Sequence, residues 1–507
     1  MLKRICFSIV GLTMLIISCK KDSLIGDIKE INEVKIGGIA ASYTVSLGVP
    51  LVITPELKFT QDNESNTGRY QYEWYSAEGV RVDIANTRNL NTEIKLTPGT
   101  HNSVYYRVTD TQTGVKWTKM FSISIVTPIY EGWLVLGDVD GIARLDMVSL
   151  KDNVYTPIYD VLGLTGSALK LKGSAVDVSY FPYRASKQGI YVSSTGTGTT
   201  KIDPESFAWD AQMYISYESL IPSLPDNYLA DFVQPKGNRG VSYMYKDGKF
   251  YYNKDDQGYR YSVPINVMTG STTEFRAAPF VASVIQGDFS TNGASVLYDA
   301  TNRKFVNHQP SSVTCSDMPA GTLFNFTTGK DLVYMESTTY NGSFANGDVF
   351  AVLKDEGAPN YHLARISLAA FGVSFQQNYW DVMNATDISL AENFAVSPDL
   401  GYVFYNVGGK LYEYDMFLKK SKLMLDKGAE KITMLRFHKF VYPFGAATPK
   451  YSNKLIVGSY DPARPSASSG KLELFTVPAV NADLVVLESY TGFGKIKDIT
   501  YRERYPR

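Results

Sequence analysis

The chain has 507 residues, of which 44 % are hydrophobic and 20 % charged, and its formal net charge is −1. This length allows two or more domains, and the balanced charge without a basic cluster argues against a nucleic-acid partner. There are three cysteines, and Cys6 and Cys19 lie in or directly after the first apolar segment, so Cys315 would be alone in a processed chain and could form no internal disulfide.

The first apolar segment spans residues 5–17 and follows Lys3 and Arg4. It is shorter than the roughly 20 residues that a membrane-spanning helix needs, but it suits the apolar region of a secretory signal. The segment ends in LIISC at positions 15–19, which resembles the lipobox of bacterial lipoproteins. The resemblance implies that residues 1–18 are a signal peptide and that Cys19 carries the lipid. The alternative is a soluble secreted protein with a cysteine there by coincidence.

Residues 19–29 are mostly polar and are predicted to form a tether. From residue 30 to residue 127 the pattern is that of short strands with alternating apolar positions, for example at 70–75, 104–108 and 121–125, separated by turn clusters. About seven such strands in some 100 residues, with Trp74 in the middle of one, predict a β-sandwich of the immunoglobulin or PKD-like type. Trp74 is expected to be its core tryptophan.

Residues 128–507 repeat a loose unit of an apolar strand, a glycine-containing turn and a second strand. The clearest copies lie at 132–146, 242–252, 401–415 and 454–475, and Asp247-Gly248 and Gly408-Gly409 are typical hairpin turns. The spacing predicts an all-β, β-propeller-like domain with six to eight blades, seven being favoured. Residues 497–502 are expected to close the ring onto the first blade. An irregular β-solenoid or two further sandwiches remain the alternatives.

No catalytic residue, metal site or cofactor site is predicted. The four histidines are far apart and form no H-E-x-x-H sequence, and no G-x-S-x-G sequence is present. Two aromatic segments outside clear strands remain, and they give the candidate ligand-binding residues Trp209, Tyr214, Tyr379, Trp380 and Asp381. Such rings could stack on a sugar or a peptide, and packing between blades is the alternative.

The lipobox, residues 30–34 and the strand at 72–75 together resemble the PKD-like lipoproteins of Bacteroidota. The resemblance implies a lipid-anchored outer-membrane protein that faces the cell exterior. Its expected partners are a TonB-dependent transporter of the starch-utilisation type and that transporter's substrate-binding lipoprotein, with a glycan or peptide as ligand. The implied role is binding or scaffolding in nutrient uptake. A surface glycosidase, lyase or peptidase acting from the propeller face is the alternative.

Overall fold

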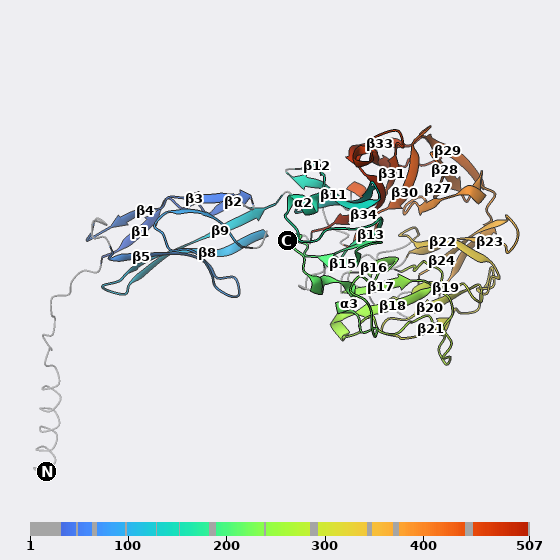
Figure 1. The fold of residues 1–507 in the computed structure, drawn as a ribbon, viewed down its shortest axis with the longest axis horizontal. Helices are drawn as coiled ribbons and strands as arrows, with labels where there is room; N and C mark the ends of the chain where they lie inside the picture. The colour runs from blue at the N-terminus through green and yellow to red at the C-terminus, as the bar shows by residue number, and fades with distance from the viewer. Residues whose placement is uncertain are drawn as a thin grey trace, which may run out of the picture. The chain divides into compact units, whose positions relative to one another are not determined.

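The computed structural model describes residues 32–46, 49–62, 68–96, 99–127, 129–151, 153–181, 189–237, 240–283, 293–341, 347–368, 375–441 and 450–504. The predicted signal peptide, the tether and Cys19 lie outside these residues. The chain divides into two compact units, Met1–Thr127 and Pro128–Arg507, and each is described by itself (Figure 1). Among the described residues, no helix combines the length and apolar character needed to cross a membrane.

The first unit is a β-sandwich. Its main sheet has the order β2-β9-β8-β5-β6, with β2 and β9 parallel. Within the described residues, the sandwich also contains two two-stranded sheets, β1-β4 and β3-β7. The strands are β1 (Val34–Gly37), β2 (Ser42–Ser46), β3 (Pro50–Ile53), β4 (Glu56–Phe59), β5 (Tyr70–Ser76), β6 (Val82–Ala85), β7 (Leu90–Glu93), β8 (Gly99–Asp110) and β9 (Lys116–Val126).

Trp74 lies at the centre of the sandwich core. Its side chain is fully buried, its ring centroid lies 4.3 Å from that of Tyr106, and Phe121 packs edge-on at 6.0 Å. The indole Nε1 donates a hydrogen bond of 2.7 Å to the carbonyl oxygen of Thr87. Trp74 therefore has the core position expected from the sequence, with its polar atom bonded as burial requires.

The second unit is a β-propeller, and in the described part of the chain it has seven sheets, one for each blade (Figure 1). Blade 1 contains β10 (Gly132–Val139), β11 (Ile142–Lys151), β12 (Val154–Ile158) and β34 (Lys495–Arg502). Blade 2 contains β13 (Ala175–Tyr180), β14 (Ile190–Ser194) and β15 (Gly198–Ile202). Blade 3 contains β16 (Phe232–Lys236), β17 (Val241–Lys246) and β18 (Lys249–Lys254). Blade 4 contains β19 (Ser295–Asp299), β20 (Lys304–His308) and β21 (Cys315–Asp317).

The last three blades each have four strands. Blade 5 contains β22 (Asp331–Ser337), β23 (Asp348–Lys354), β24 (Tyr361–Ser367) and β25 (Gln377–Val382). Blade 6 contains β26 (Asn393–Val396), β27 (Val403–Val407), β28 (Lys410–Asp415) and β29 (Lys420–Asp426). Blade 7 contains β30 (Lys431–Phe437), β31 (Lys454–Tyr460), β32 (Gly470–Thr476) and β33 (Val485–Phe493). The two short helices described are α2 (Val161–Leu164) and α3 (Ile215–Glu218).

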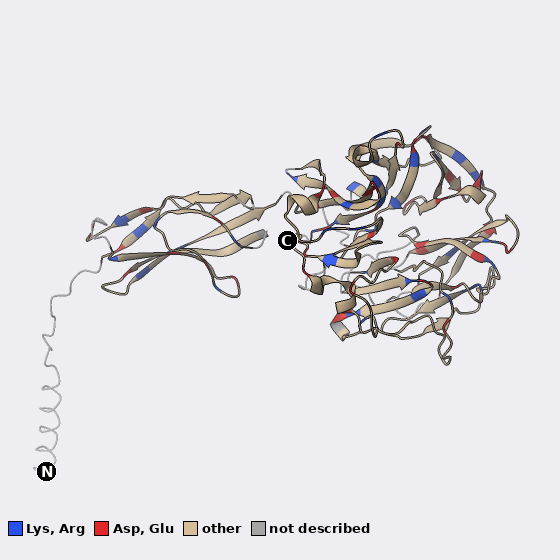
Figure 2. Cartoon of the chain, viewed as in Figure 1, with Lys and Arg blue, Asp and Glu red and all other residues tan. Residues whose placement is uncertain are grey.

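The ring closes through β34, which supplies the inner strand of blade 1. It pairs antiparallel with β10, placing Trp133 opposite Tyr501 and Val135 opposite Ile499. The predicted closing strand is thus confirmed, as are the all-β class and the propeller. The apolar core lies between neighbouring blades, since single clusters combine residues of two sheets, such as Trp133 of blade 1 with Ile456 of blade 7. Basic and acidic residues are both scattered over the strands and loops of the described residues (Figure 2).

Candidate functional site

A cavity of about 450 Å³ lies on the axis of the propeller. All seven blades border it, through β13, β16, β22, β26, β30 and β34 and, in blade 4, through the segment Pro279–Val281. This segment reaches its sheet through a bridge from Ala282 to Val296. The inner strands of a closed propeller converge on its axis, and the ring therefore brings together polar side chains from distant parts of the sequence.

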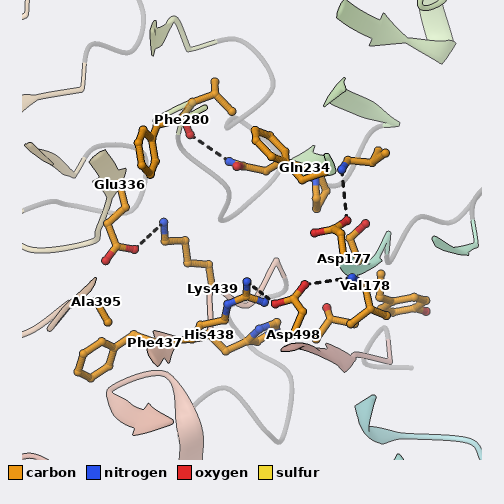
Figure 3. Close-up of a pocket in the computed structure, with 18 of the residues that line it drawn as sticks. Asp177, Val178, Gln234, Phe280, Glu336, Ala395, Phe437, His438, Lys439 and Asp498 are labelled. Carbon is orange, nitrogen blue, oxygen red and sulfur yellow. Dashed lines mark hydrogen bonds and ion pairs between the residues drawn. The ribbon is translucent and has the colours of Figure 1, made fainter. Parts of the chain in front are cut away.

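One wall of the cavity carries two aspartates, Asp177 of β13 and Asp498 of β34 (Figure 3). Asp498 accepts a 3.0 Å bond from the backbone amide of Val178 and forms an ion pair of 2.7 Å with Arg436. Asp177 accepts a 3.3 Å bond from the amide of Val233. The Asp498 carboxylate is thus neutralised by a cation, whereas the Asp177 carboxyl has a backbone amide as its hydrogen-bond partner.

The position of Asp177 changes its protonation. Burial deep in the propeller is the main cause that raises the pKa of its carboxyl well above the ordinary value, and repulsion by Asp498 adds to it. The more distant Arg436 opposes this shift of the pKa without cancelling it. Asp177 borders the cavity and is only half-buried by surface, so a bound molecule can contact its carboxyl. The carboxyl of Asp177 is therefore harder to ionise than an ordinary aspartate, and it borders the cavity.

Across the cavity from this wall lie Glu336 and Lys439 (Figure 3). Their ion pair measures 3.1 Å, and Glu336 also accepts a 2.6 Å bond from the amide of Val396. Aromatic rings lie next to them: Tyr334 stacks on Phe394 at 5.3 Å and meets Phe280 edge-on at 5.5 Å. The cavity therefore combines charged groups on opposite walls with aromatic rings beside one of them, which is typical of sites that orient a small ligand.

His438 also borders the cavity and is neutral. Burial lowers the pKa of its imidazole to about 3, and the charges of Arg436 and Lys439 act in the same direction. Its ring packs edge-on against Trp133 at 5.3 Å and Phe440 at 4.6 Å, and its Nε2 has no hydrogen-bond partner in the described part of the chain. A neutral imidazole adds no positive charge to balance Asp177.

A second cavity, of about 360 Å³, lies where the inner strands β13, β26, β30 and β34 begin. Lys497 borders both cavities. Its side chain is exposed and forms no ion pair among the described residues. A free cation therefore lies on β34, one residue before Asp498.

The predicted candidates Trp209 and Tyr214 lie together near the outer strand of blade 2, where Tyr214 bridges Thr200 of β15. Their rings meet edge-on at 5.5 Å, and Trp209 Nε1 donates a 2.8 Å hydrogen bond to the Thr200 hydroxyl. Trp209 is partly buried against the core shared by blades 1 and 2. Most of its ring thus serves packing.

Tyr379, Trp380 and Asp381 lie on β25, the outermost strand of blade 5. Trp380 is stacked between Phe324 at 4.6 Å and His362 at 5.3 Å, the Tyr379 hydroxyl donates to the carbonyl oxygen of Met416, and Asp381 pairs with Lys419. None of the five candidates borders either cavity, and the two groups lie on different blades. Their role in ligand binding stays a prediction.

The sequence analysis did not single out Asp177 and Asp498. Asp177 stands between Val176 and Val178, and Asp498 stands between Lys497 and Ile499, so each occurs once in a strand of alternating character, which is also the pattern of a solvent-facing position. A carboxylate on an innermost strand was the available signal. Recognising it required knowing which strand of each blade is innermost.

Residues 25–197 match the sequence profile of the PKD-like family. The match covers the sandwich and continues through blade 1 into blade 2. The PKD-like part of the resemblance is thereby confirmed. No curated protein matches the chain.

Solved structures with a similar fold share little sequence with this chain. A quinoprotein alcohol dehydrogenase-like protein of Bacteroides thetaiotaomicron is 12 % identical, with 91 % of this chain and 97 % of that one covered and a TM-score of 0.42. YCF48 of Cyanidioschyzon merolae is 13 % identical, with coverages of 64 % and 95 % and a TM-score of 0.33. The extracellular domain of a hybrid two-component system of B. thetaiotaomicron is 12 % identical, with coverages of 64 % and 35 % and a TM-score of 0.33. The seven-bladed assignment rests on the strand pairing of this chain itself.

Proposed function

We propose that this chain is a lipid-anchored binding and scaffold protein on the outer surface of an outer membrane, accessory to a TonB-dependent complex that takes up peptides or glycans. The observation that carries the binding role is the axial cavity, because all seven blades border it and it joins charged groups to aromatic rings. Cavities of this size and mixture are the usual sites of small ligands.

The anchoring part of the proposal is supported by the sequence LIISC at 15–19. The Cys19→Ala variant should move from the outer-membrane fraction to the soluble fraction, because it removes the sulfur that would carry the lipid. Cys6→Ala is the matched control, since it alters a cysteine within the apolar segment, and it should stay with the membrane. Continued membrane association of Cys19→Ala would contradict the anchor.

The accessory part is supported by the PKD-like match and by the resemblance to lipoproteins encoded beside such transporters. The full chain, extracted in mild detergent, should copurify with a TonB-dependent transporter that mass spectrometry identifies. Extraction of the Cys19→Ala form from the same cells is the control for association after lysis. Absence of the transporter from the full-chain preparation would refute the accessory role.

A peptidase is the second candidate function, and one observation favours it. Two neighbouring carboxyls are the catalytic arrangement of aspartic proteases, and Asp177 and Asp498 border the same cavity and repel each other electrostatically. Incubation of the purified full chain with pooled peptides separates the two functions. Cleavage that Asp498→Asn abolishes would overturn the binding proposal in favour of the peptidase.

A further inference from the structure

Most of the charges around the axial cavity compensate one another. Three of the acidic side chains that border it have a cationic partner within 3.1 Å. The pairs are Asp231 with Lys246, Glu336 with Lys439, and Asp498 with Arg436. A buried charge that has such a partner and further hydrogen bonds needs nothing from a ligand.

Asp177 and Lys497 also border the cavity and differ from these pairs. Asp177 forms no ion pair within 4.0 Å among the described residues, and its bond from the amide of Val233 supplies no cation. Lys497 likewise has no carboxylate partner in the described part of the chain. Both lie on adjacent inner strands, since β13 packs against β34. The cavity wall thus presents one acidic and one basic side chain without an ion pair among the described residues.

The geometry points to a zwitterionic ligand. We infer that the cavity binds the free ammonium group of an amino acid or short peptide at Asp177, with the ligand's carboxylate directed toward Lys497 and an apolar side chain against Phe280, Tyr334 and Phe394. This inference rests on the proposed binding function and specifies its ligand.

The surroundings of Asp177 support an ammonium as the bound group. Burial and repulsion by Asp498 raise the pKa of its carboxyl, and no cation pairs with it within 4.0 Å among the described residues. A ligand ammonium would supply that cation and would form a charge-assisted hydrogen bond, which is stronger than a neutral one. A neutral glycan would bring no cation, so the charges favour the peptide over the glycan.

Size sets the length of the ligand. A volume of about 450 Å³ is in the lower part of the range of ligand pockets, about 300–1,000 Å³. It accommodates an amino acid or a peptide of a few residues. A folded protein would reach the cavity only with a terminus.

The test is isothermal titration of the detergent-purified full chain with alanyl-phenylalanyl-alanine. The N-acetylated tripeptide, the C-terminal amide of the tripeptide and maltotriose are compared under the same conditions. We expect the free tripeptide to bind, N-acetylation to weaken binding about tenfold or more, and amidation to weaken it about threefold, because Lys497 is exposed and its charge is screened.

The decisive variant is Asp177→Asn. It keeps the size of the side chain and removes the charge that would pair with the ligand's ammonium, and Asp177 has no ion pair to lose among the described residues. The melting temperature should therefore stay unchanged while affinity for the free tripeptide falls about tenfold. Asp317→Asn is the matched control, because Asp317 is an exposed partner of Lys304 in blade 4 and borders neither cavity. It should bind like the unmodified chain.

Three outcomes would overturn the inference: no binding of the free tripeptide, equal binding of its N-acetylated form, or binding of maltotriose that Asp177→Asn leaves intact. The last outcome would replace the peptide by a glycan. Copurification with the transporter is measured separately and does not depend on Asp177. Failure of the peptide inference and failure of the proposed accessory role can therefore be told apart.

Discussion

At the scale of single residues, His308 shows how the propeller fixes a protonation state. Its Nε2 lies 2.8 Å from the carbonyl oxygen of Ser312, which can only accept, so Nε2 carries the proton. Its Nδ1 lies 2.9 Å from the Tyr243 hydroxyl, which donates a 2.9 Å hydrogen bond to Ser295 Oγ. The network joins blades 3 and 4. Burial lowers the pKa of His308 to about 3.

This depressed pKa predicts acid sensitivity. In the unfolded chain, the His308 imidazole binds a proton below about pH 6.5, whereas in the folded chain it stays neutral down to about pH 3. The unfolded state thus binds more protons in this window, and the free energy of unfolding falls by up to about 1.4 kcal/mol for each pH unit as the pH drops. His438 contributes in the same way.

Urea unfolding of the full chain between pH 7 and pH 4 measures this effect. His308→Gln should reduce the slope of stability against pH by about 1.4 kcal/mol per unit, although it is less stable at pH 7. Above pH 7 the two curves should run parallel, which serves as the internal control. Equal slopes below pH 6 would show that His308 is protonated in the folded state.

Arg502 gives a second prediction at this scale. It is fully buried, none of its guanidinium nitrogens has a hydrogen bond in the described part of the chain, and its nearest carboxylate, Glu205, lies 3.6 Å away. Burial lowers the pKa of Arg502 to about 10. Glu205 already receives two hydrogen bonds from Arg504. Arg502 therefore bears a desolvation cost that its weak ion pair does not offset.

Arg502→Met, which keeps the volume of the side chain, should raise the free energy of unfolding by about 1–3 kcal/mol. Arg504→Met is the comparison, and it should destabilise the propeller because Glu205 and the carbonyl oxygen of Tyr130 lose their donors. Differential scanning calorimetry of both variants measures the two effects. A fall in stability for Arg502→Met would contradict an uncompensated desolvation cost of the Arg502 guanidinium.

At the scale of elements, β34 links the two ends of the propeller. Its residue Ile499 is fully buried in the apolar cluster between blades 1 and 7, beside Trp133 and Ile456. The same strand carries Lys497 and Asp498 into the cavity wall. Ring closure and the candidate site consequently depend on one strand.

Ile499→Ala should therefore destabilise the propeller by about 2–5 kcal/mol, through lost burial and the void that remains. Ile142→Ala is matched in chemistry but lies at a position that is 53 % exposed, and it should cost under about 1 kcal/mol. Thermal unfolding followed by near-ultraviolet circular dichroism measures both. Equal melting temperatures for the two variants would argue against closure through β34.

The elements themselves could largely be predicted from the sequence. Asp247-Gly248 joins β17 to β18 and Gly408-Gly409 joins β27 to β28, since tight hairpin turns need residues that tolerate positive φ. The inner edge of blade 4 could not be predicted, because Pro279 interrupts the strand pattern there and only isolated bridges hold the segment. Hairpins can be predicted from the local pattern of apolar and turn residues. The order of the strands from the axis to the rim cannot, because it is set only when the ring closes.

At the scale of the whole molecule, the site could not be predicted because it exists only after closure. The amide of Val178 and the carboxylate of Asp498 that it binds are 320 positions apart. The local sequence pointed to aromatic residues outside clear strand patterns, such as Trp380. In the structure, the Trp380 ring is stacked between two neighbours in the outer part of blade 5. The cavity instead draws on single polar residues, each unremarkable within its own strand.

If the propeller axis holds the ligand, a crystal structure of the full chain with alanyl-phenylalanyl-alanine will show it. We expect the peptide in the axial cavity, with its ammonium within hydrogen-bonding distance of the Asp177 carboxylate and its phenyl ring against Phe280 and Tyr334. Peptide bound instead beside Trp209 or Trp380 on the outer strands, with the axial cavity empty, would contradict it.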